Sequence, residues 1–96
     1  MKKEKLELET KLKMISAATE TLALARKQDV LDIEKVLRQV SDIISKEKIE
    51  EVKIGMIAAS SKALSMLQRN PNLKDKEILK QITNELPEIY DSITNI

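Results

Sequence analysis

Residues 49–69 read IEEVKIGMIAASSKALSMLQR, and this stretch decides the fold. Apolar residues recur in it at intervals of three and four positions, which is the period of an α-helix. This first apolar face consists of Ile49, Val52, Met56, Ala59, Ala63 and Met66. A second apolar face consists of Ile54, Ile57, Leu64 and Leu67, and residues 54–61 carry no charge. A helix that is apolar on several sides is normally the central helix of its domain.

The only glycine of the chain, Gly55, lies inside this stretch. A glycine in a helix interior costs about 1 kcal/mol relative to alanine. That cost is easiest to explain if a neighbouring helix packs closely against the position. Several nearby residues are also small, namely Ala58, Ala59, Ser60 and Ala63. We therefore expect a close helix–helix contact at the middle of residues 49–69.

Three other stretches show the same helical period. Together with residues 49–69, they predict helices at about 4–27, 30–46 and 75–94. The apolar stripe of the first helix is Leu8, Leu12, Ile15, Ala18, Leu22 and Ala25. Pro87 lies inside the last helix, and its apolar stripe keeps its phase across the proline. Because proline removes one backbone hydrogen bond and clashes with the preceding turn, we expect a kink there.

The connections between the helices differ in how clearly the sequence marks them. Asn70 precedes Pro71, and a residue before proline is pushed out of the helical region, so a turn is expected there. Asp29 is a candidate N-cap for the second helix. No glycine or proline separates the first two helices, and their apolar phase runs on through the junction. One long N-terminal helix that forms a helical dimer is therefore the alternative.

We favour a hairpin over the long helix because three polar residues, Thr19, Arg26 and Asp29, would fall in succession on the seam. The fold class predicted is all-α: a small antiparallel bundle of four helices that forms one domain over residues 1–96. The third helix is expected to be central.

Composition narrows the classes of function. The chain has no Cys and no His, which removes zinc sites of the His/Cys type, thiol chemistry and Ser–His catalysis. Its single Gly lies in a helix, so no Gly-rich phosphate loop is present. No apolar run approaches the roughly 20 residues of a membrane span, and no apolar signal-peptide core follows the Lys-rich start. We expect a cytoplasmic protein with no membrane attachment, no metal and no cofactor.

Paired carboxylates are the remaining candidates for catalysis. On a helix, Glu47 and Glu51 share a face at i, i+4, and Glu85 and Glu88 share one at i, i+3. Helical di-metal sites combine such glutamates with histidine, which is missing. We interpret these carboxylates as parts of solvated helix faces and predict that the protein is not an enzyme.

The third and fourth predicted helices carry many aliphatic residues. The alternatives are a core that absorbs all of them and a core that leaves some of them uncovered. Uncovered aliphatic side chains on adjacent helices form a groove or a dimer face. We therefore expect a non-catalytic module for protein–protein interaction or assembly, with a homodimer as one form. The residues predicted to bind the partner are Met56, Ser60, Leu64, Leu67, Ile89 and Ile93.

Nucleic acid binding is the alternative function. The lysines that would contact phosphate are Lys46, Lys48, Lys53 and Lys62. Net charge is only +1, and Tyr90 is the one aromatic residue, so the chain lacks a stacking platform for single strands. Base recognition also relies on arginine more than on lysine. The sequence therefore favours a protein partner over a nucleic acid.

Overall fold

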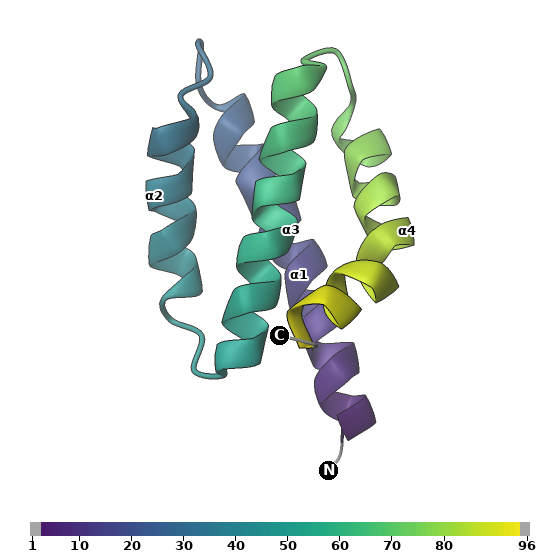
Figure 1. Cartoon of the computed structure of the whole chain (residues 1–96). Coiled ribbons are helices and arrows are strands. Elements are labelled where there is room, and N and C mark those ends of the chain that lie inside the picture. Colours follow the sequence, from purple (N-terminus) through teal and green to yellow (C-terminus); the bar gives the residue numbers. More distant parts are fainter. Residues whose placement is uncertain (1–2, 95–96) are drawn as a thin grey trace.

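The computed structural model describes residues 3–94, with side chains from residue 5 onward. Four α-helices follow one another along the chain: α1 (Lys3–Arg26), α2 (Ile33–Ile44), α3 (Glu50–Arg69) and α4 (Asp75–Thr94). Successive helices run in opposite directions (Figure 1). The described part of the chain contains no strand, and the predicted all-α bundle is confirmed.

Two helices, α1 and α3, form the centre of the bundle. Each of them contacts the three other helices, whereas α2 and α4 lie on opposite sides of the pair and do not touch each other (Figure 1). The predicted central position of the third helix is therefore confirmed, and α1 shares it.

The two helices pack closely at Gly55. A Cβ atom at this position would lie 3.0 Å from Met14 Cγ, 3.1 Å from Met14 Sδ and 3.2 Å from Thr10 Cγ2. Such distances are shorter than ordinary van der Waals contact between carbon atoms, which is about 3.5–4.0 Å. The absence of a side chain at residue 55 thus lets α1 pack against the backbone of α3, as the sequence predicted.

The predicted buried face of α1 is confirmed in the second half of the helix, where Ala18, Leu22 and Ala25 are buried, and is wrong in the first half. Leu8 and Leu12 are 60% and 63% exposed. The buried residues of α1 that the prediction missed also recur at the helical period, and they are Thr10, Met14, Ala17 and Thr21. Both threonine hydroxyls donate to backbone carbonyls one turn earlier at 2.7 Å, Thr10 to Leu6 and Thr21 to Ala17. Because the hydroxyl is satisfied within its own helix, a threonine can be buried, and Thr10 is buried where α1 packs against Gly55 of α3.

A loop separates α1 from α2, so the hairpin is confirmed and the single long helix is not formed. Residues 27–32 are non-helical, and α2 begins later than predicted. Asp32, not Asp29, is the N-cap, and its carboxylate accepts a hydrogen bond from the Lys35 N–H at 3.1 Å. The Asp32 N–H itself donates to Gln28 Oε1 at 2.7 Å. This second bond fixes the chain just before the cap.

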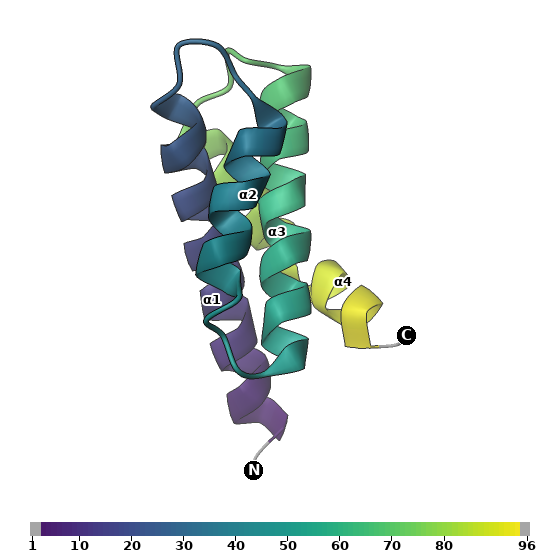
Figure 2. The ribbon, with the colours of Figure 1, turned by 90° about the vertical axis from the view of Figure 1, so that its left-hand side faces the viewer.

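The last helix, α4, is continuous through Pro87 and changes direction in its second half (Figure 1). Figure 2 shows this second half extending beyond α3 on the side away from α1. Tyr90 anchors it, because its hydroxyl donates to Glu51 at 2.9 Å and the Lys11 ammonium lies 5.5 Å from the ring centroid. Burial, together with the bond to Glu51, raises the pKa of Tyr90 to about 12.

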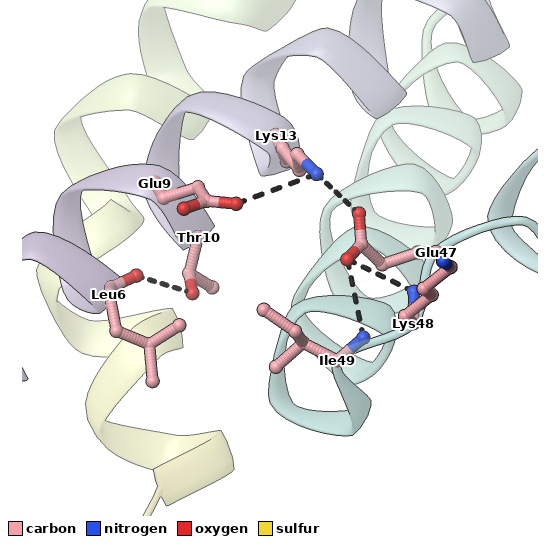
Figure 3. A network of polar contacts seen from close by, with 7 residues as sticks. All are labelled: Leu6, Glu9, Thr10, Lys13, Glu47, Lys48 and Ile49. Atoms are coloured by element: carbon pink, nitrogen blue, oxygen red, sulfur yellow. Dashed lines mark hydrogen bonds and ion pairs between the residues drawn. The ribbon is translucent and has the colours of Figure 1, made fainter.

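A polar network ties α1 to the loop between α2 and α3 (Figure 3). Lys13 Nζ lies 2.5 Å from Glu47 Oε1 and 3.6 Å from Glu9 Oε2. The other carboxylate oxygen of Glu47 accepts from the N–H groups of Lys48 at 3.1 Å and Ile49 at 3.3 Å. Glu47 thereby satisfies backbone donors just before α3. Its hydrogen bond to Lys13 lowers the pKa of Glu47 and raises the pKa of Lys13.

Substitution of Gly55 by valine tests the α1–α3 contact. We expect Gly55→Val to lower the free energy of unfolding by about 2 kcal/mol, because its Cβ atom already crowds Met14 and Thr10 and its two methyl groups need further space. Ala23→Val adds the same groups at an exposed position of α1 and should cost only about 0.5 kcal/mol in helix propensity. Urea unfolding followed by circular dichroism measures both. Equal losses of stability in the two variants would contradict the close contact between α1 and α3 at Gly55.

Replacement of Glu47 by glutamine tests the network in Figure 3. The pKa of this carboxyl falls below its ordinary value of 4.5 on folding, so the charged form stabilises the protein above pH 4.5. That contribution is lost as the pH falls through the lowered pKa of the folded state. Glu47→Gln should therefore be less stable than the parent at pH 7, and the difference should close in acid. A difference that does not change with pH would show that the charge of Glu47 has no part in it.

Candidate protein interface

Four of the six residues predicted to bind a partner lie in the core of the bundle. Met56, Ser60, Leu64 and Leu67 are all buried in the described structure. A side chain that its own helices cover offers little surface to a second protein. The expectation that these four residues form an exposed aliphatic surface is therefore wrong, because they lie between the helices.

Two of these four still reach the base of surface hollows. Leu64 lines a groove of about 140 Å³ between α2 and α3, together with Ile33, Leu37, Ser61, Ser65 and Gln68. Leu67 lines a larger hollow of about 540 Å³, to which residues 28–31 and Pro71 of the two connecting loops contribute. Leu37 is 39% exposed, so the rim of the smaller groove is apolar as well.

The other two predicted residues, Ile89 and Ile93, lie on the second half of α4. Both are half-buried, and Ile89 packs against the core. They belong to the part of α4 that extends from the bundle in Figure 2. Each therefore keeps part of its aliphatic surface accessible.

The outward side of α3 shows a surface that the predicted residue set misses. Between Glu50 and Gln68, the exposed residues of this helix are Ile54, Ile57 and Ser61, none of which is charged. Ile54 is 37% exposed and Ile57 is 52% exposed. The sequence signal for this surface is the charge-free run of residues 54–61.

Two smaller residues, Ala58 and Ser65, are half-buried beside these three. We call the five residues the α3 face: Ile54, Ile57, Ala58, Ser61 and Ser65. Charged residues limit it at both ends, Glu50 in the first turn of α3 and Arg69 in the last. The face is thus an uncharged strip along a helix of a chain in which 34% of residues are charged.

The four lysines of the alternative function do not line one free surface. Lys46 and Lys48 are exposed in the loop before α3. Lys53 and Lys62 are nine residues apart on α3, and at about 100° per residue they point to opposite sides of the helix. Lys62 Nζ lies 2.8 Å from Glu85, and its hydrogen bond lowers the pKa of that carboxyl.

Three of the four carboxylates considered for catalysis have structural partners, and the fourth, Glu88, is exposed. Glu47 and Glu51 do not share a helix face, because Glu47 lies in the loop before α3. Glu47 binds Lys13, Glu51 accepts from Tyr90, and Glu85 binds Lys62. The described residues contain no group of three or more acidic side chains placed to share a metal ion.

No helix within residues 3–94 is both long enough and apolar enough to cross a membrane. Comparisons with protein-family models, with curated proteins and with solved structures find no match to this chain.

Ser60 offers a test of the corrected assignment to the core. Its hydroxyl is buried and, among the described residues, has no hydrogen-bond partner. Removal of an unsatisfied buried hydroxyl is favourable, so Ser60→Ala should raise the free energy of unfolding by about 1 kcal/mol or more. Ser61→Ala, at the exposed neighbouring position, gains helix propensity alone, about 0.5 kcal/mol. Urea unfolding compares the two. A Ser60→Ala variant less stable than the parent would show that the hydroxyl has a partner.

Proposed function

We propose that the protein is a non-catalytic module for protein–protein interaction or assembly, and that it binds its partner through the α3 face. One observation carries this proposal: α3 exposes two isoleucines in a strip without any charged residue. Solvent-facing sides of helices are ordinarily charged. An exposed strip that is both aliphatic and uncharged is typical of a surface that another protein covers.

Covering this face has a favourable free energy. Burial of a fully exposed isoleucine contributes about 1.5–3 kcal/mol, so Ile54 and Ile57, which are 37% and 52% exposed, contribute about 1 kcal/mol each. The strip contains no charge whose desolvation would oppose binding. Its polar atoms are two serine hydroxyls, which keep hydrogen-bond acceptors in their own helix within reach.

The shape of the surface favours a helical partner. Ala58, Ser61 and Ser65 are small and leave room for a second helix to approach the backbone of α3. The groove that ends at Leu64 accepts an aliphatic side chain between α2 and α3. Apolar anchors at helical spacing that enter such a groove are a common mode of recognition.

Substitution of Ile57 by lysine tests this function. The tagged protein is incubated with native cell extract and with an untagged copy of itself, after nuclease treatment and in high salt. We expect Ile57→Lys to weaken retention of the bound protein about tenfold or more, because it places a charge in an apolar contact. Leu12→Lys is the matched control, since Leu12 is an exposed aliphatic residue of α1. This control should bind like the parent.

Two results would overturn the proposal. One is a bound protein that responds to Leu12→Lys and not to Ile57→Lys. The other is recovery of RNA or DNA with loss of all binding after nuclease treatment, which would support phosphate contacts by lysines such as Lys46 and Lys48. Phosphate binding would also weaken steeply with salt, whereas apolar association would not.

A further inference from the structure

We propose that the partner of the α3 face is a second copy of this chain, with the two α3 helices packed antiparallel across a two-fold axis. This inference rests on the proposed function of the α3 face and names its partner. Three features of the described residues support it: the order of large and small side chains along α3, the opposite charges at its two ends, and the position of the second half of α4.

The sizes of the side chains are complementary under this symmetry. The large residues of the face, Ile54 and Ile57, lie in the first half of α3, and the small residues Ser61 and Ser65 lie in the second half. A two-fold axis at the midpoint of the helix, between residues 59 and 60, brings Ile54 level with Ser65 of the second copy. Ala58 then comes level with Ser61 of the second copy. Ile54 thus meets a small residue, whereas Ile57 comes level with Lys62 of the second copy and lies one residue from the level of Ser61 on the α3 face.

The charges at the ends of α3 are complementary as well. The same axis places Glu50 level with Arg69 of the second copy, and the symmetry creates this pair twice. Within residues 3–94, neither side chain takes part in an ion pair, although Arg69 Nη2 donates to Ser65 Oγ at 3.1 Å. A parallel arrangement would place Glu50 beside its own copy and would align the two helix dipoles, both of which are unfavourable.

The α3 helix alone offers too little surface for a stable dimer, so α4 has to contribute to the contact. About 800 Å² per partner is typical, whereas a helix of 20 residues, about 30 Å long and 10–12 Å wide, offers only about 350 Å². The second half of α4 extends beyond α3 on the side away from α1 (Figure 2). In the proposed dimer, its candidate contact on the second copy is the hollow of about 320 Å³ between α3 and α4, whose lining combines Met66 and Leu73 with polar and charged residues such as Gln81 and Glu85. This contact supplies area that α3 alone lacks.

Reversal of the charges at Glu50 and Arg69 tests the antiparallel dimer. Sedimentation velocity over a range of concentrations should show a dimer for the parent chain. We expect Glu50→Arg and Arg69→Glu each to raise the dimer dissociation constant about tenfold, because each turns two attractive pairs into repulsive ones. An equimolar mixture of the two variants should restore the dimer, since each heterodimer regains two opposite-charge pairs. Both residues are exposed, so circular dichroism should show unchanged helicity.

A second pair of variants tests the aliphatic part of the dimer contact. Ile57→Lys should abolish the dimer, and Leu12→Lys, on the exposed side of α1, should leave it intact. A parent chain that is monomeric at every concentration would overturn the inference. So would a mixture of charge variants that stays dissociated, or a dimer that Leu12→Lys disrupts and Ile57→Lys does not. If the chain is monomeric and still retains another protein in an Ile57-dependent manner, the second copy is excluded as partner and the proposed function stands.

Discussion

The contact of α1 with α3 at Gly55 is the constraint on which the rest of the structure depends. Without a Cβ atom at this position, Met14 and Thr10 reach the backbone of α3. This approach fixes the side of α3 that faces α1. Since α2 and α4 lie on the two flanks of the pair (Figure 1), one side of α3 is left to solvent. The close contact on one side of the helix and the exposed aliphatic strip on the other are therefore consequences of the same packing.

Much of this fold could be predicted from the sequence, because the helical period and the turn at Pro71 are local signals. The buried face of α1 was predicted correctly at Ala18, Leu22 and Ala25, but in the first half of the helix it could not be predicted. Leu8 and Leu12 continue the apolar period, but at about 100° per residue each lies about 160° from Thr10, on the side of α1 that faces away from α3. Thr10 and Thr21 are polar residues, yet each hydroxyl is satisfied inside its helix, and Thr10 is small enough to pack at Gly55.

The site was harder to predict than the fold for a related reason. Residues 49–69 carry two apolar faces, and periodicity does not say which of them the other helices cover. Leu64 and Leu67 were expected at the surface and lie in the core. The position of Gly55 distinguishes the two faces, because it marks the side of α3 that faces α1. At about 100° per residue, Ile57 lies about 160° from Gly55 and so points away from α1.

The central claim is that the exposed aliphatic strip of α3 becomes covered when the protein assembles. The most direct measurement is the relaxation that a soluble paramagnetic agent causes in the methyl groups of Ile57 and Leu12, at low and at high protein concentration. The two side chains are 52% and 63% exposed in the single chain, so they should respond alike when the protein is dilute. We expect the effect on Ile57 to fall at high concentration and the effect on Leu12 to persist. Protection of Leu12 with Ile57 still accessible would contradict the account.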